Sequence, residues 1–179
     1  MSVDEQPHKA NLEKIPQLRP AFAKNGTITP ANSSSISDGA SALLLASEVA
    51  AGSNGLTPKA RIVAHGRHSL APESFTLAPI GAVEKVLNKA GWNAKDVDLW
   101  EINEAFAMVT MLTTRALDLD PACVNIHGGA CAQGHPIGST GSRVIVTLMH
   151  ALQRYGKKRG VAALCIGGGE ATAVAIELI

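Results

Sequence analysis

Residues 161–179, VAALCIGGGEATAVAIELI, decide the fold class. Two apolar runs, 161–165 and 171–179, lie on either side of three consecutive glycines, 167–169. Short runs of small and β-branched residues favour β-strands, and a glycine cluster between them favours a tight turn. The stretch therefore predicts an antiparallel hairpin, or a tight return within a mixed sheet.

Strand-like and helical segments alternate upstream of this hairpin. Strand character is found at 59–65, 98–102 and 124–126, and helical character at 80–90, 105–117 and 139–154. In the 80–90 segment the apolar residues fall at helical spacing, and Gly91 supplies a stop. The alternation predicts an α/β layered fold with a mixed five-stranded sheet and packed helices, with right-handed crossovers between parallel strands.

The first third of the chain has a different character. Up to about residue 36 it is polar and contains four prolines, so we expect an extended arm. Ser37 and Asp38 then offer N-cap oxygens to an Ala/Leu-rich run, residues 39–48. This run predicts a buried helix within residues 37–57.

Composition excludes several classes of function. The chain has 179 residues and a net charge of +1, which gives no long-range field for nucleic acid or anionic lipid. It contains neither an apolar run of about 20 residues nor a signal-peptide pattern, so we expect a soluble, cytoplasmic protein. Its three cysteines make a disulfide framework unlikely to form in that compartment.

Three residues have side chains that could react or bind a ligand at the rim of the sheet. Asn103 follows a predicted strand, His135 lies between Gly134 and Pro136, and Cys165 precedes the glycine run. Ligands of open α/β sheets usually bind at such a rim. His135 and Cys165 suggest a pair for thiolate or proton-transfer chemistry, and glycine N–H groups can face a developing oxyanion. The alternative is that both residues only support the core.

A metal site is the rival interpretation of the same region. His127, Cys131 and His135 recur every fourth residue, a spacing that aligns ligands on one face of a helix. The intervening glycines and Pro136 disfavour a continuous helix, so we expect no metal there. The segment 165–169 is also a weak match to a phosphate loop, because the Lys-Ser/Thr pair is missing.

Taken together, the motifs resemble the C-terminal half of the thiolases, the family of acetyl-CoA acetyltransferases and 3-ketoacyl-CoA thiolases. They are LRPAF at 18–22, the segment 32–40, NEAFA at 103–107, NIHGGACAQGHPIGSTGSR at 125–143 and CIGGG at 165–169. Their order and approximate spacing follow the family over nearly the whole chain. The resemblance implies a thiolase-like fold in which residues 1–36 are the tail of the CoA-covering loop region. It further implies that residues 37–57 form a helix of the N-terminal domain and that residues 58–179 form the C-terminal domain.

The resemblance also implies a role for each site residue. His135 would activate a nucleophilic cysteine and donate to the thioester oxygen, and Cys165 would move a proton to or from the methyl carbon of acetyl-CoA. Asn103 would hold a water in one oxyanion hole, and the backbone N–H of Gly167 would contribute to the other. Hydrogen bonds aimed at the enolate oxygen suit this reaction, because the α-carbanion is costly. The positions that resemble walls of the CoA tunnel are Ser34, Ala105 and Phe106.

The implied function is acyl transfer, either condensation of acetyl-CoA to acetoacetyl-CoA or thiolysis of 3-ketoacyl-CoA. CoA thioesters would be the substrates, with no further cofactor, and the implied partners are a complementary N-terminal half and further copies of the chain. The family's nucleophile lies in a Cys-Ser-Gly-like turn, whereas Cys123 and Cys131 do not. We therefore expect these two cysteines to be packing residues and the isolated chain to be inactive.

Two other hypotheses remain open at this point. The chain could be a non-catalytic thiolase-like module that binds CoA or a partner subunit. It could also be a zinc or redox protein, which would require retained metal. Acyl chain length and the direction of the reaction are not determined by the sequence.

Overall fold

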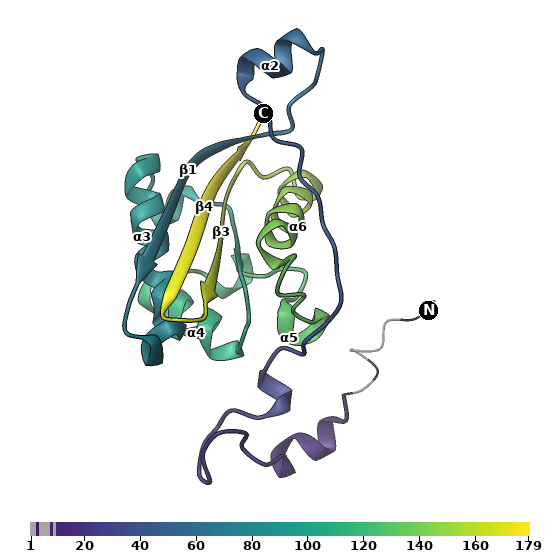
Figure 1. Cartoon of the computed structure of the whole chain (residues 1–179), viewed down its shortest axis with the longest axis vertical. Helices are drawn as coiled ribbons and strands as arrows, with labels where there is room; N and C mark the ends of the chain where they lie inside the picture. The colour runs from purple at the N-terminus through teal and green to yellow at the C-terminus, as the bar shows by residue number, and fades with distance from the viewer. Residues whose placement is uncertain (1–2, 4–7, 9) are drawn as a thin grey trace.

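The computed structural model describes residues 3, 8 and 10–179 (Figure 1). The part of the expected N-terminal arm at residues 1–2, 4–7 and 9 lies outside the described residues. The elements in chain order are η1 (Leu12–Gln17), η2 (Pro30–Asn32), α2 (Glu48–Ser53), β1 (Ala60–Ser69), η3 (Pro72–Leu77), α3 (Ala78–Ala90), η4 (Ala94–Asp96), β2 (Leu99–Ile102), α4 (Ala107–Ala116), η5 (Pro121–Cys123), α5 (Ala130–Gln133), α6 (Thr140–Arg154), β3 (Arg159–Ile166) and β4 (Glu170–Leu178).

The strands form one mixed sheet in the order β1-β4-β3-β2. β4 pairs antiparallel with both β1 and β3, whereas β2 and β3 are parallel. The predicted hairpin is confirmed: Cys165 pairs with Ala171, and Gly168 and Gly169 take positive φ angles of 91° and 93° in the turn. The carboxyl ends of β2 and β3 therefore lie at the same edge of the sheet.

Helices cover the two faces of this sheet differently. Along β3, Val161 and Ala163 pack in the cluster that contains Val83 and Val86 of α3, while Ala162 packs in the cluster that contains Leu148 of α6. This alternation is the two-residue period of a strand between two layers. α6 lies against β2 and β3, and Figure 1 shows it on the side away from β1.

The predicted helices over 80–90, 105–117 and 139–154 are confirmed as α3, α4 and α6. Gly91 ends α3 in the left-handed conformation, with a φ of 68°. From residue 10 to residue 36, the N-terminal arm is irregular apart from the short 3-10 turns η1 and η2 and two isolated bridges. Three elements are longer than predicted: β1 continues to Ser69, β3 spans Arg159–Ile166, and α3 begins at Ala78.

The prediction of five strands was wrong, because the sheet of the described residues has four. The segment 124–126 makes a single bridge, from Val124 to Trp100 of β2. Asn125 then turns away with a φ of 48°, and its side chain takes the place of a strand peptide. Its Oδ1 accepts from the Ile102 N–H at 2.8 Å, and its Nδ2 donates to the Ile102 carbonyl at 2.8 Å.

The prediction of a buried helix within residues 37–57 was also wrong in its extent. Residues 38–47 have no regular structure, and only α2, Glu48–Ser53, is helical. Leu44 and Leu45 are 84% and 69% exposed. Helices in proteins depend mostly on packing of an apolar face, and the two leucines of this run are not buried by any described residue.

No helix in the described part of the chain is long and apolar enough to cross a membrane.

Candidate active site

The candidate active site lies where β2 and β3 end and α6 begins. The N–H of Asn103 donates to the Ala163 carbonyl at 2.9 Å, which continues the pairing of β2 with β3 past the end of β2. α6 runs back along these strands toward the start of β3, so its first turn lies at the same edge. Gly141 of that turn and Leu164 of β3 line one cavity.

Asn103 is fixed at this edge and has one unused donor. Its side chain is 1% exposed, and its Oδ1 accepts from Nη2 of Arg143 at 3.3 Å. Its Nδ2 is buried without a hydrogen-bond partner. A buried N–H group usually has a partner, so this amide is suited to hold a water or a substrate oxygen.

Arg143 brings a positive charge beneath the site. It projects from α6 toward β2, where its Nη1 lies 3.9 Å from Oε2 of Glu101. Burial raises the pKa of Glu101 to about 7, and Glu104 adds to that rise while Arg143 opposes it. Burial also lowers the pKa of Arg143. An arginine nevertheless keeps its proton at neutral pH.

His135 is held by backbone and side-chain contacts together. Its N–H donates to the Ser35 carbonyl at 2.9 Å, and its Nδ1 lies 2.7 Å from Oγ1 of Thr140. The Thr140 hydroxyl donates its proton to the Pro136 carbonyl at 2.9 Å, so Oγ1 accepts from Nδ1–H. This leaves the lone pair on Nε2. Burial, and then the charge of Arg143, lower the pKa of His135, which favours the neutral base.

Cys165 lies one strand away from Asn103, near the end of β3. It is buried at 7% exposure, and strand alternation places its side chain in the cluster on the α3 face. Burial raises the pKa of its thiol, which favours the protonated form. Gly167 begins the turn after β3, and a Cβ added there would meet no atom within 4 Å.

Side-chain contacts link two of these residues, whereas the third is connected to them only through the backbone. Asn103 and His135 are linked by contacts through Arg143 and Thr140 of one helical turn. Cys165 shares their sheet edge through the strand pairing alone. The catalytic roles of the four residues, Asn103, His135, Cys165 and Gly167, stay predictions.

The predicted tunnel residues form a second group at the same edge. Both the N–H and the Oγ of Ser34 donate to the Ala105 carbonyl, at 3.2 and 3.0 Å. Phe106 bridges to Ser33 and makes edge contacts with Phe22 and Phe75, with ring centroids 5.9 and 6.3 Å apart. The N-terminal arm is therefore pinned beside the strand-to-helix junction.

The alternative metal ligands are held apart by the backbone. α5 contains only Ala130–Gln133, and Gly128 and Gly134 take φ angles of 83° and 90° on either side of it. Nε2 of His127 instead lies 3.2 Å from the Tyr155 hydroxyl. The N–H of Cys131 donates to Glu104 at 3.1 Å, and burial raises the Cys131 pKa to about 11.

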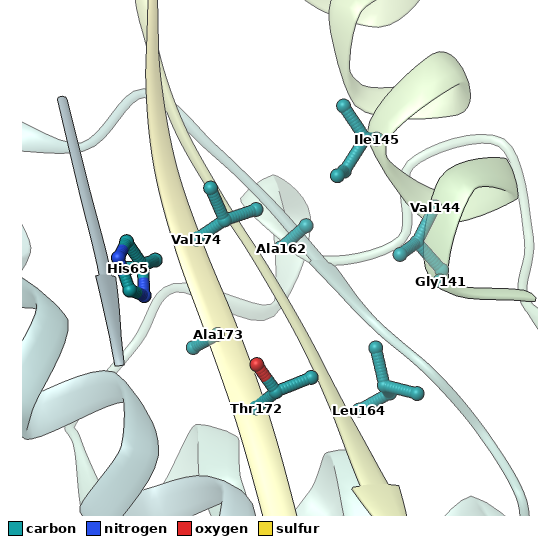
Figure 2. A pocket seen from close by; sticks show the side chains of 9 residues that line it. All are labelled: His65, Gly141, Val144, Ile145, Ala162, Leu164, Thr172, Ala173 and Val174. Atoms are coloured by element: carbon teal, nitrogen blue, oxygen red, sulfur yellow. The ribbon is translucent and has the colours of Figure 1, made fainter. Parts of the chain in front are cut away.

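A groove of about 220 Å³ opens beside α6 (Figure 2). Gly141, Val144 and Ile145 of α6 form one wall. The floor comes from three strands, with Ala162, Leu164, Thr172, Ala173 and Val174 from β3 and β4 and His65 from β1. The groove is lined mainly by apolar side chains and begins at Gly141, in the first turn of α6.

Sequence reasoning missed the polar layer under the site. Glu101, Glu104, Thr140 and Arg143 had no assigned role. A charged residue inside the buried run Leu99–Ile102 was a usable signal, because an unpaired buried carboxylate is costly. The partner of Glu101 is Arg143, which lies 42 residues away in sequence, so the position of Glu101 did not indicate it.

Comparison with known proteins covers the whole chain. The family model "Thiolase, C-terminal domain" matches residues 56–178, and "Thiolase, N-terminal domain" matches residues 1–49. A probable acetyl-CoA acetyltransferase of Dictyostelium discoideum is 51% identical over 97% of this chain and 42% of its own length. The cytosolic acetyl-CoA acetyltransferase of Mus musculus is 47% identical over 99% of this chain and 45% of its own length.

A solved structure gives the same picture of the fold. Human mitochondrial 3-ketoacyl-CoA thiolase in complex with CoA matches with a TM-score of 0.90 and 39% identity, over 100% of this chain and 46% of that one. The chain thus spans about half the length of the relatives it matches.

Proposed function

The chain belongs to the thiolase family, and we propose that it supplies the acid and base residues of a CoA-dependent acyl transfer. The reaction is condensation of acetyl-CoA to acetoacetyl-CoA, or thiolysis of a 3-ketoacyl-CoA. The observation that supports the proposal is a buried amide with a free donor that is linked through Arg143 and Thr140 to a neutral imidazole, with a buried thiol on the adjacent strand.

Each group has a definite task in the condensation. Nε2 of His135 takes the proton of the nucleophilic thiol, which the complementary half would provide, keeps it, and donates an Nε2–H hydrogen bond to the thioester oxygen. The nucleophilic thiolate attacks the carbonyl carbon of a first acetyl-CoA, the C–S bond to CoA breaks, and the leaving CoA thiolate takes the proton of the Cys165 thiol. The resulting Cys165 thiolate takes a proton from the methyl carbon of a second acetyl-CoA, so that a C–H bond breaks and an S–H bond forms. The freed electron pair forms an enolate, whose oxygen accepts hydrogen bonds from His135 and from the water on Asn103.

The enolate carbon then attacks the acetyl group on the nucleophilic cysteine. A C–C bond forms, the C–S bond breaks, and the nucleophile leaves as a thiolate. Charge is conserved, because one thiolate is consumed at Cys165 and one is released. In thiolysis the steps reverse, and the protonated thiol that burial favours at Cys165 delivers its proton to the enolate carbon.

The proposed partner is a complementary N-terminal thiolase half. Two features support this: the apolar groove beside α6 and the exposed leucines of residues 38–47. Figure 1 shows this segment running past α6, and the Ser41 hydroxyl contacts those of Ser139 and Ser142 at 2.7 and 2.6 Å. Apolar surface gathered along one side of a domain is typical of an interface. We also propose self-association and a cytosolic location, the latter because the mouse relative is named cytosolic.

The test is co-expression of the chain with a matching N-terminal half, followed by assay of acetoacetyl-CoA thiolysis. We expect turnover by the pair and none by the 179-residue chain alone. Cys165→Ala and His135→Ala should each lower kcat at least about 100-fold, because each removes a proton carrier. Tyr155→Phe, an exposed change, is the control. Full activity of Cys165→Ala, or turnover by the chain alone, would contradict the proposal.

A non-catalytic thiolase-like module is the second candidate. It would bind CoA and the complementary half with unchanged affinity in the Cys165→Ala variant, yet show no turnover in the unsubstituted pair. The same co-expression therefore separates the two functions.

A further inference from the structure

A single arginine contacts the buried amide of the site from below. Nη2 of Arg143 donates to Oδ1 of Asn103 at 3.3 Å, while Nδ2 of the same amide has no partner and is shielded from solvent. Nη1 of Arg143 lies 3.9 Å from Oε2 of Glu101. Glu101, Arg143 and Asn103 thus form a chain of polar groups that runs from the middle of β2 to the sheet edge.

Arg143 can hydrogen-bond to only one end of the Asn103 amide. The two ends of an asparagine amide have nearly the same shape, so packing alone barely distinguishes them, whereas one end donates and the other accepts. A guanidinium has only donors and cannot lose its proton in a protein. It therefore selects the oxygen of Asn103, and the nitrogen must point the other way.

We propose that Arg143 is a positioning residue that locks the Asn103 amide with its nitrogen toward the substrate. The inference rests on the proposed function in one respect, namely that the free Nδ2 donates to a water or oxygen of the reacting thioester. With the amide reversed, Oδ1 would take one O–H of the bound water, so that water would have one fewer O–H group to turn toward the developing enolate oxygen. The lock therefore sets how well the water on Asn103 stabilises the charge.

Burial is what makes the lock effective. The Asn103 side chain is 1% exposed, so water cannot replace the arginine as a donor to Oδ1. Glu101 is 2% exposed and lies on the other side of the guanidinium, where it offsets the buried positive charge. Oε2 of Glu101 is 3.9 Å from Nη1, so the two groups attract electrostatically, while Nε and Nη1 of Arg143 are buried without hydrogen-bond partners.

The first test is a double-mutant cycle on turnover by the co-expressed pair. Arg143→Gln can donate or accept, so it no longer selects one amide orientation. We expect kcat for thiolysis to fall about 10-fold to 100-fold with KM within about threefold, because the lost interaction acts in the transition state. In the Asn103→Ala background the same substitution should cost less than about threefold, and Arg143→Lys should restore part of kcat.

Controls separate this role from a general loss of structure. Arg154→Gln removes an exposed arginine from the same helix and should leave kcat unchanged. If Arg143→Gln is unstable because it strands the Glu101 carboxylate, the variant Glu101→Gln with Arg143→Gln keeps the layer neutral. Equal losses of kcat in the presence and absence of the Asn103 side chain would overturn the proposal, as would a rise in KM alone.

A second measurement does not depend on turnover. In the 179-residue chain, the unfolding equilibrium constants of Arg143→Gln, Asn103→Ala and the double variant give the coupling between the two side chains. We expect a coupling of about tenfold, typical of a buried hydrogen bond to a charged group. Absence of coupling overturns the lock whether or not the pair is active. Coupling without turnover by the unsubstituted pair would instead refute the proposed function and leave the lock in place.

Discussion

At the scale of single residues, Glu101 shows how the site affects stability. Its carboxyl group is buried in β2, and burial raises its pKa from 4.5 to about 7 despite the nearby Arg143. The folded chain therefore binds the proton of Glu101 more tightly than the unfolded chain does. This contribution is fully present below about pH 4.5 and is lost as the pH rises through about 7.

Glu101→Gln should remove this pH dependence. The free energy of unfolding of the unsubstituted chain, relative to Glu101→Gln, should fall by up to about 3 kcal/mol between pH 4.5 and pH 8, given 1.36 kcal/mol for each pKa unit. Urea unfolding at a series of pH values measures the difference. Glu84→Gln on the exposed side of α3 should show no such trend. A difference that stays constant across this range would mean that Glu101 titrates normally in the fold.

A second residue, His135, shows how a hydrogen bond to one ring nitrogen, Nδ1, leaves the other, Nε2, free to act as the base. The Thr140 hydroxyl accepts from Nδ1–H because its own proton goes to the Pro136 carbonyl. The sequence indicated His135 as a candidate base, but the choice of Nε2 comes from a residue five positions later. Contacts of this kind within one turn at a helix start could have been anticipated, since Thr140 immediately follows the predicted helix boundary.

At the scale of elements, an asparagine side chain replaces a fifth strand. Asn125 makes two hydrogen bonds of 2.8 Å with the backbone of Ile102, and its own backbone has a φ of 48°. A residue with positive φ cannot continue an extended strand. The apolar run 124–126 was read as a strand because the pattern of three residues carries no information about this backbone turn.

Asn125→Gly should destabilise the chain by about 1–3 kcal/mol, because it leaves the N–H of buried Ile102 without a partner and its carbonyl with only the Thr110 hydroxyl at 3.1 Å. Glycine tolerates the positive φ, so the loss reports the hydrogen bonds and not backbone strain. Chemical denaturation measures it. Asp118→Gly is the matched control, since Asp118 also has a positive φ, 50°, but is exposed, and its stability should change by less than about 0.5 kcal/mol. Equal changes in both variants would contradict this account of Asn125.

The Ala/Leu-rich run 39–48 shows the opposite situation, in which local propensity is overridden. Its composition favours a helix, yet residues 38–47 are irregular and only α2 forms. Ser41 is held by hydroxyl contacts to Ser139 and Ser142, and the leucines face solvent. Without a surface to pack against, the apolar side chains contribute no energy to a helix.

At the scale of the whole molecule, the groove beside α6 leaves part of the sheet formed by β3 and β4 uncovered. Ile145 lies on its wall and is partly buried, and the neighbouring floor of β3 and β4 is apolar. Under the proposed function, the complementary half covers this face. A charge introduced there should then disrupt association before it disrupts the fold.

Ile145→Glu should weaken binding of the co-expressed N-terminal half by at least about tenfold, because a carboxylate would be desolvated at the interface. Copurification and titration measure the loss, and the circular dichroism of the chain alone verifies the fold. Met111→Glu is the control, because Met111 is equally apolar and 68% exposed on α4, outside the groove. Undiminished binding by Ile145→Glu would show that the half docks elsewhere.

The sequence by itself determined the alternation of strands and helices after residue 58, the hairpin at 161–179, the end of α3 at Gly91 and the family. These features are local, because residue periodicity and glycine positions specify them within a few residues. Tertiary structure alone decided that Arg143 faces Asn103 and Glu101, that Asn125 substitutes for a strand, and that residues 38–47 stay unpaired and irregular. Each of these outcomes depends on the burial of polar or apolar groups by segments far apart in the chain, and sequence spacing carries no record of such burial.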